Sequence, residues 1–231
     1  MRDPAVRARI LSEDRFAGSN FPLLARLSFE RMFPFGDPPD YTPPKESSIA
    51  AQAAREGRTP EDVAYDMLLA DDGRSFIFCA LTNYADYTLE ASAELLRHPN
   101  TIVGLSDGGA HVGFISDGSF PSFVLAYWGK QRGIAVEELV RRQSSDTARA
   151  AGLHDRGLLK PGLRADINVI DWEALALERP GMLYDLPGGG RRLMQKARGY
   201  RATVKAGKIT YRDGVATGAL PGGLVRGAQS A

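Results

Sequence analysis

The sequence has little of three features that mark special classes of protein. Cys79 is the only cysteine among 231 residues, which excludes an internal disulfide bond. Lysine and arginine number 29 against 28 acidic residues, and the net charge of +1 predicts neither a nucleic-acid partner nor an anionic membrane partner. No apolar run approaches the roughly 18 residues of a membrane span, and the start, Met1–Ala5, has no hydrophobic signal region. These absences predict a reduced, cytoplasmic protein.

What the chain does contain is the composition of an ordinary globular protein. Its residues are 43% hydrophobic and 25% charged, and its length suffices for one large domain or two small ones. Cys79 lies within the apolar run 76–81. We therefore expect it to be a small buried core residue, with a catalytic thiol as the less favoured interpretation.

Up to about residue 157 the sequence alternates predicted helices and strands. A proline-rich stretch, 33–44, is too rigid for a helix and too interrupted for a strand. Two apolar runs, 76–81 and 101–105, predict buried strands, and a helix over 88–97 between them makes one βαβ unit with parallel strands. The other predicted helices cover 48–56, the residues after Thr59-Pro60, 121–128 and 136–151, the last broken near Ser144-Ser145.

From Gly157 onward the helical spacing of apolar residues ends. Residues 158–171 indicate a turn that leads into a strand, and 202–214 indicate a hairpin with its turn at Ala206-Gly207-Lys208. The tail of about 70 residues is thus a small β module, since helical periodicity stops there. We expect two domains, 1–157 and 158–231.

Asp107 is the strongest candidate for chemistry. It follows the apolar run 101–105 and precedes Gly108-Gly109, at the carboxyl end of a predicted strand. In α/β sheets and barrels the catalytic groups lie beyond these strand ends. An Asp-Gly pair also opens turns through the aspartate side chain, so the local pattern leaves both interpretations open.

Several motifs together carry a resemblance to a known family. The main ones are Ser106–His111, Ser145–Leu153 and Asp155–Val169, followed by the hairpin residues Lys205–Lys208. They resemble the C-terminal end of a metal-dependent amidohydrolase. The whole length is most similar to the N-acyl-D-amino-acid deacylase (D-aminoacylase) branch. Three further segments support this similarity: Asn83–Asp86, Asp185–Gly190 and Gly218–Pro221. The resemblance implies an α/β fold: the last strands and helices of a (β/α)8 TIM-like barrel, with 101–105 as its eighth strand, and then part of a small β-sandwich.

The resemblance also implies an activity and a site. The activity is hydrolysis of linear amide bonds, with zinc (one or two divalent ions) at the mouth of the barrel. Asp107 is then a metal ligand and the catalytic acid: a metal-bound hydroxide attacks the carbonyl, and Asp107 carries the proton to the departing nitrogen. His111 is close enough in sequence to contact the substrate, and a loop histidine held by backbone is the alternative. His98 and His154 are interpreted as structural.

The chain departs from the family pattern in its histidines and its length. Family members have a His-x-His pair on the first barrel strand and further histidines on middle strands, whereas this sequence has three histidines and no such pair. Zinc needs three or four protein ligands, and a complete barrel takes roughly 250 residues. We therefore expect the C-terminal part of a longer enzyme whose partner is the missing N-terminal barrel portion. Alone, the chain is expected to be poorly folded and inactive.

The expected substrate is a small-molecule amide. In D-aminoacylases an arginine shortly after the catalytic aspartate suits a bidentate grip on the substrate carboxylate. The matching stretch here, Val112–Phe123, has no arginine or lysine, and Lys130 and Arg132 are possible substitutes farther along. Two alternatives remain: an amidohydrolase that acts on a cyclic amide, and a non-catalytic remnant that serves as a scaffold.

Overall fold

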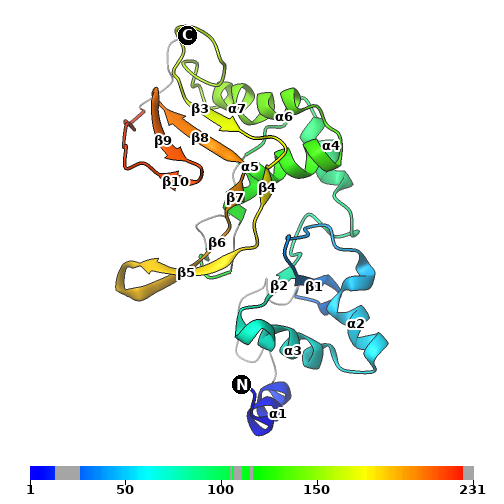
Figure 1. Cartoon of the computed structure of the whole chain (residues 1–231). Helices are drawn as coiled ribbons and strands as arrows, with labels where there is room; N and C mark the ends of the chain where they lie inside the picture. Colours follow the sequence, from blue (N-terminus) through cyan, green and yellow to red (C-terminus); the bar gives the residue numbers. More distant parts are fainter. Residues whose placement is uncertain (14–26, 105, 107–110, 115–116, 226–231) are drawn as a thin grey trace. The chain divides into compact units, whose positions relative to one another are not determined.

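The computed structural model describes residues 1–13, 27–104, 106, 111–114 and 117–225 and divides into two compact units (Figure 1). Unit 1 is Met1–Arg97 and unit 2 is His98–Ala231. Helices and strands are mixed in both units, which agrees with the predicted α/β class. The predicted division of the whole protein at 157/158 stays a prediction.

Unit 1 contains a two-stranded antiparallel sheet. Strand β1 (Met32–Phe35) pairs with β2 (Phe76–Cys79), and Pro34 stands opposite Ile77. The proline-rich stretch therefore contributes a strand, and the prediction that it was too interrupted for one is wrong. The strand tolerates Pro34 because an edge strand needs backbone donors on one side only.

Two capped helices pack against this sheet. Ser48 Oγ accepts from the Ala51 N–H at the start of α2 (Ile49–Glu56), and Gly57 ends that helix in the left-handed region, at φ 64°. Thr59 caps α3 (Pro60–Gly73). Both predicted helix starts are confirmed. The helices and the sheet share one apolar cluster, which consists of Ile49, Ala53, Val63 and Ala64 with Phe29, Met32, Met67 and Ile77 around them.

A second, aromatic cluster lies beside Cys79. It consists of Phe33, Ala80 and Tyr84 with Phe78, Tyr87 and Leu89 packed against them. Cys79 itself is half-buried. Burial raises the pKa of its thiol, against a weaker opposing effect of the Arg31 charge. A thiol that stays protonated at neutral pH is a poor nucleophile, which agrees with a packing role. The remaining elements of unit 1 are α1 (Pro4–Ser12), η2 (Phe29–Arg31), η3 (Lys45–Ser47) and α4 (Glu90–Arg97).

The described residues do not form the predicted βαβ unit. Helix α4 is present, but residues 101–104 have no regular structure and the side chain of Ile102 is 55% exposed. Strand β2 pairs with β1, and every strand pair in the described ranges is antiparallel. A parallel strand forms only between neighbours that complete its hydrogen bonds. The described residues supply none for 101–104, and Leu105 lies outside them.

Unit 2 begins with a helical layer. Helix α5 (Phe120–Phe123) continues as the π-helical η5 (Val124–Gln131), followed by α6 (Val136–Gln143) and α7 (Ser145–Ala150). The break between α6 and α7 at Ser144 confirms the predicted interruption. The layer buries Val124, Leu125, Trp128 and Leu139. No helix in the described parts of the chain is both long enough and apolar enough to cross a membrane.

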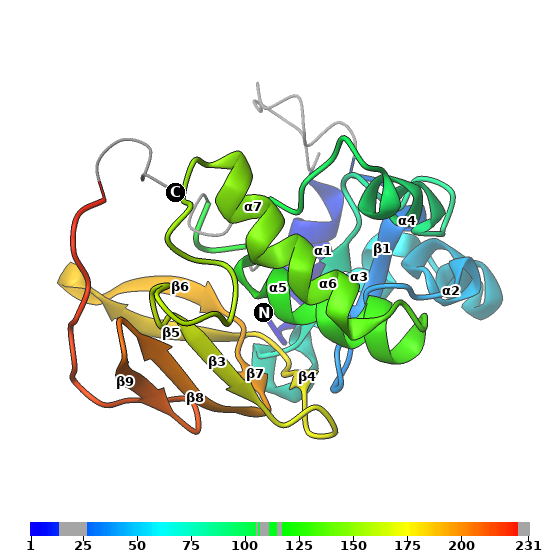
Figure 2. The same cartoon turned by 90° about the horizontal axis from the view of Figure 1, so that it is seen from above.

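The strands of unit 2 form antiparallel sheets beside these helices (Figure 2). The largest has the order β10-β9-β8-β3. In its β8–β9 hairpin Ala206 and Gly207, with φ angles of 50° and 77°, form the turn, and Lys208 already begins β9. The sequence predicted a turn at this place over Ala206-Gly207-Lys208. The barrel and the sandwich stay predictions. The strands of this largest sheet are β3 (Ile167–Ile170), β8 (Tyr200–Lys205), β9 (Lys208–Arg212) and β10 (Val215–Ala216). Two further sheets have two strands each: β4 (Ala176–Leu177) pairs with β7 (Ala197–Arg198), and β5 (Gly181–Leu186) pairs with β6 (Gly190–Met194).

Candidate functional site

Asp107, the predicted catalytic acid and metal ligand, lies outside the described residues, as do Leu105 and 108–110. Its role therefore stays a prediction. The structure does describe Ser106 and His111 on either side, the turn that follows His111, and the helix and strands to which that turn is bound. These surroundings define what the structure contributes to the site.

His111 begins a short turn. Its φ of 46° is in the left-handed region, which histidine enters more readily than most residues. The imidazole stacks on the Phe114 ring, with 5.3 Å between centroids and 23° between planes, and the His111 carbonyl accepts from the Phe114 N–H at 3.0 Å. The residue is exposed. This turn presents the imidazole at the surface, so contact with a substrate stays a prediction that the geometry allows.

The segment after His111 is bound to the strands at two points. The Leu193 N–H donates to the Val112 carbonyl at 2.6 Å. Farther along, the Ser119 hydroxyl bonds to the side-chain oxygen of Gln195. Leu193 belongs to β6 and Gln195 directly follows it. The β5–β6 hairpin region therefore holds the turn that leaves the Asp107 segment.

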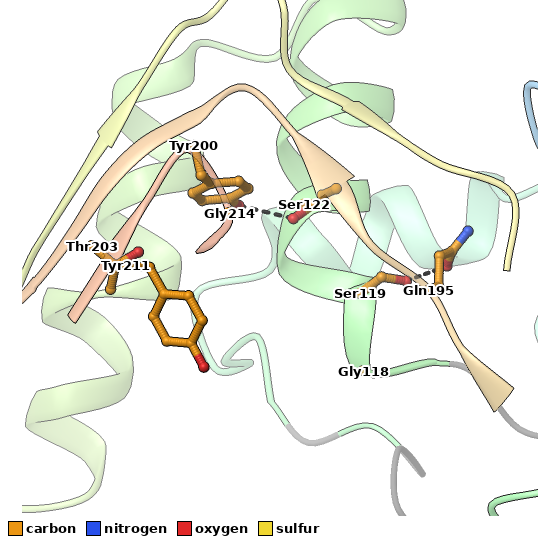
Figure 3. A pocket seen from close by; sticks show the side chains of 9 residues that line it. Gly118, Ser119, Ser122, Gln195, Tyr200, Thr203, Tyr211 and Gly214 are labelled. Atoms are coloured by element: carbon orange, nitrogen blue, oxygen red, sulfur yellow. Dashed lines mark hydrogen bonds between the residues drawn. The ribbon is translucent and has the colours of Figure 1, made fainter. Parts of the chain in front are cut away.

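A shallow pocket of about 250 Å³ opens between the start of α5 and strands β8 and β9 (Figure 3). Across it, Ser122 Oγ and Tyr200 OH share a hydrogen bond of 2.8 Å. An acyl-transfer serine needs a basic partner within hydrogen-bond reach, and Ser122 has a phenol there instead. The polar side chains that line the pocket are Ser119, Ser122, Gln195, Tyr200, Thr203 and Tyr211. None of them is charged, so the pocket favours a ligand with neutral polar groups.

The two predicted substitutes for a carboxylate-binding arginine have structural contacts. Lys130 Nζ donates to the carbonyls of Glu173 and Leu175, at 2.9 and 3.2 Å, and lies 6.0 Å from the centre of the Trp172 ring. Arg132 lies 6.0 Å from the centre of the Trp128 ring. Lys130 thus ties η5 to the segment before β4, which explains its presence without a substrate.

The described residues do not fit a zinc site. His98 Nδ1 accepts from the Asn100 N–H at 3.2 Å, so this nitrogen serves a local turn, and His154 is exposed after α7. Nowhere in the described ranges do three or more His, Cys, Asp or Glu side chains gather so that they could hold a metal ion. Zinc needs three or four protein ligands, so any such site requires ligands from elsewhere.

Asp166 is a hydrogen-bonding centre of the motif Asp155–Val169. Its carboxylate accepts from the Ala206 N–H at 2.8 Å and pairs with Lys205 and, at 3.3 Å, with Arg164 Nε. Burial by itself would raise the pKa of Asp166, but the hydrogen bonds from Lys205 and Ala206 outweigh it and hold the pKa below its usual value. Asp166 therefore fixes the start of β3 to the β8–β9 turn.

Gly157 joins two further motifs. Its φ is 93°, and a Cβ at this position would lie 2.9 Å from Ser145 Cα and 3.1 Å from the Ala148 Cβ. The backbone can lie against α7 only because residue 157 has no side chain. The motifs Ser145–Leu153 and Asp155–Val169 thus pack against each other at Gly157.

Arg142 is a buried residue that the sequence analysis did not single out. It is 6% exposed, although half of the residues in α6 are charged. A signal was present: Arg142 stands three positions after the fully buried Leu139, and residues three apart share a helix face.

Comparison with known families bears on the whole of this region. Residues 42–211 match the Amidohydrolase family, and this range includes Asp107, His111 and the motifs that meet around Gly157 and Asp166. No curated protein and no solved structure matches the chain. Members of the family are generally metal-dependent. Since the match covers well over half of the sequence, the chain belongs to the amidohydrolase family of hydrolases.

Proposed function

We propose that the chain is the C-terminal portion of a hydrolase that cleaves linear amide bonds, similar to the N-acyl-D-amino-acid deacylases. The observation that carries this proposal is the family match over 42–211, which contains the segment Ser106–His111. Catalytic residues of α/β barrels lie at the carboxyl ends of strands, and the sequence places Asp107 two residues after the apolar run 101–105.

In this proposal Asp107 handles the proton. It takes the proton from the attacking water, which makes the water a better nucleophile, and delivers it to the amide nitrogen as the carbon–nitrogen bond breaks. Such general acid–base catalysis contributes about 10²- to 10⁴-fold to the rate. His111, exposed and held by its stack on Phe114, contacts the substrate.

A divalent ion, zinc by the resemblance, would supply a Lewis acid that lowers the pKa of water. Because the described residues do not fit a zinc site, we assign most of its ligands to an N-terminal barrel portion that completes this chain. A cytoplasmic location is part of the proposal.

The substrate is a small-molecule amide. An acyl-D-amino acid requires a cation for its carboxylate, and Lys130 already binds two backbone carbonyls. A cyclic amide has no carboxylate before cleavage, so the cation missing from Val112–Phe123 keeps a cyclic-amide hydrolase as the second candidate.

The test is hydrolysis by the intact gene product, purified with zinc and given N-acetyl-D-amino acids, their L-enantiomers and hydantoin. We expect release of free D-amino acid, and Asp107→Asn should lower kcat about 10²- to 10⁴-fold with an unchanged circular dichroism spectrum. Asp213→Asn is the matched control, since Asp213 lies in the exposed β9–β10 turn.

Each other outcome favours a different function. Hydrolysis of hydantoin alone would identify a cyclic-amide hydrolase. Full activity of Asp107→Asn would remove the proposed proton carrier. A stable fold without metal, together with no hydrolysis of any substrate, would leave the scaffold alternative.

A further inference from the structure

We infer that the pocket between α5 and strands β8 and β9 binds a small neutral molecule that joins a flat apolar group to an acceptor oxygen, as an aromatic amide does. All residues that line this pocket belong to unit 2 and lie within the described ranges. The binding site does not depend on the proposed function, and it would exist in a chain that hydrolyses nothing.

Ser122 and Tyr200 have one more hydroxyl hydrogen than they use. Ser122 Oγ and Tyr200 OH lie 2.8 Å apart, and either of them can be the donor. Each hydroxyl has one hydrogen to donate, so the pair uses one of its two hydrogens internally. Among the described residues no other group accepts the second hydrogen. Both side chains line the pocket (Figure 3), so a ligand there can supply the acceptor.

The burial of Ser122 gives this donor its weight. The residue is only 7% exposed, and a buried donor without an acceptor is costly. The contact between the two hydroxyls also fixes the direction of the donor before a ligand arrives. Such preorganisation improves binding because less freedom is lost when the ligand binds.

Other polar groups of the wall use their hydrogens within the protein. The Ser119 hydroxyl donates to the side-chain oxygen of Gln195, and Gln195 Nε2 donates to the Glu178 carbonyl at 2.9 Å. Thr203 Oγ1 donates to Asn168 Oδ1 at 3.0 Å. These bonds hold the wall in place, and they leave the serine–tyrosine pair as a donor that is available to a ligand.

The pocket selects against charged ligands. None of the side chains that line it is charged. A charged group that leaves water needs an ionic partner, and the lining offers neither a cation to a carboxylate nor an anion to an amine. The carbonyl oxygen of a neutral amide accepts the unused hydrogen without this cost.

Two tyrosine rings supply the apolar part of the pocket. Tyr200 is on β8 and Tyr211 on the neighbouring strand β9, where it is 49% exposed. Flat rings pair favourably with aromatic side chains. The volume of about 250 Å³ lies just below the range of about 300–1,000 Å³ that is usual for ligand pockets. We therefore expect a ligand about as large as one substituted ring.

The test is a titration of the isotope-labelled chain with benzamide and with benzoate, followed by NMR. The two compounds have nearly the same shape, but benzoate carries a negative charge. Benzamide should shift the amide signals of Gly118, Ser122, Tyr200 and Gly214, with a Kd in the millimolar range that suits so small a ligand. Benzoate should bind at least about tenfold more weakly, because the pocket has no cation for it.

The decisive variant combines Ser122→Ala with Tyr200→Phe. Removing both partners of a hydrogen bond leaves no hydroxyl unpaired, so the fold should tolerate the change. The affinity for benzamide should fall about 3- to 10-fold, which is the usual effect of one lost hydrogen bond. Tyr184→Phe is the matched control: it loses the same hydroxyl on β5, at a residue that is 68% exposed and outside the pocket.

A second variant decides if the double variant loses its circular dichroism spectrum. Tyr211→Ala removes a ring that is half exposed to solvent, and it should weaken benzamide binding about 2- to 10-fold.

Three results would overturn the inference. Benzamide that shifts no signal of the pocket at millimolar concentration would show that the pocket holds only water. Equal affinities for benzamide and benzoate would remove the selection for neutral ligands. Unchanged affinity in the folded double variant would show that the serine–tyrosine pair is not the donor.

Discussion

Within unit 2 the large apolar side chains of the helices and those of the strand region differ in their exposure to solvent. In the helical layer Leu139 is fully buried and Trp128 is 4% exposed. In the region after residue 157 large apolar side chains face solvent: Leu158, Leu159, Val169, Leu183, Tyr184, Tyr211, Val215, Leu220, Leu224 and Val225. The helical layer thus buries several of its large apolar side chains, with Val140 at 47% exposure as an exception, whereas the region after residue 157, called the β region below, exposes many of its own.

This difference separates two sources of stability. A sheet becomes stable when a second layer buries one of its faces. The sheet β10-β9-β8-β3 is instead held by hydrogen-bonded centres such as Asp166 and by its turns. In the chain as it stands, the helical core should dominate the free energy of unfolding, and the β region should depend on local polar contacts.

The largest effect should come from the helical core. Leu139→Ala removes a fully buried side chain and should lower the free energy of unfolding by about 2–5 kcal/mol. Leu159→Ala, at 84% exposure in the β region, should change it by less than about 0.5 kcal/mol. Urea denaturation followed by circular dichroism measures both. Equal effects would break the comparison.

The second effect concerns a close backbone contact inside the β region. Gly199, between β7 and β8, has a φ of 96°, and a Cβ there would lie 2.7 Å from Leu175 Cα. Gly199→Ala combines a strained backbone with a clash and should destabilise by about 2–4 kcal/mol.

Gly218→Ala is the control for this glycine. Its φ is 82°, but no atom lies within 4 Å of the added Cβ. Only the backbone strain, about 1–2 kcal/mol, should remain. Similar melting temperatures for the two variants would mean that the approach to Leu175 is not tight.

The smallest effect should come from the β region. Asp166→Asn should lower the free energy of unfolding by about 1–2 kcal/mol at pH 7, because it removes a charged acceptor from Lys205 and the Ala206 N–H. The pKa of Asp166 is lowered in the folded state, so its contribution is present above the usual pKa of an aspartate and disappears as the pH falls through the folded value.

Unfolding curves between pH 7 and pH 2 check this expectation. The difference between the parent and Asp166→Asn should close at the acid end. A difference that stays constant with pH would mean that the carboxylate charge is not what binds the turn.

Local signals in the sequence predicted local structure well. Ser48, Gly57 and Thr59 delimit helices because caps satisfy backbone groups that the helix cannot satisfy itself. Ala206-Gly207 predicted a turn because glycine adopts positive φ without strain. Such features depend on a few neighbouring residues, which a sequence displays directly.

Features that depend on distant partners were harder to predict. Residues 101–104 look like a buried strand, yet a strand exists only beside another strand. Pro34 looks like a strand breaker, and pairing with Ile77 in a two-stranded sheet makes it acceptable. For the candidate site, strand-end logic and the family motifs identify Asp107, whereas the burial of Arg142 follows from the packing of α6.

The single cysteine has a practical consequence. Cys79 is half-buried on β2, its thiol is held in the protonated form, and no second cysteine competes with it. Its reaction with an alkylating reagent is therefore slow in the closed state and fast whenever β1 and β2 separate. The rate of alkylation of Cys79, measured by mass spectrometry, would report how often unit 1 opens, without any engineered label.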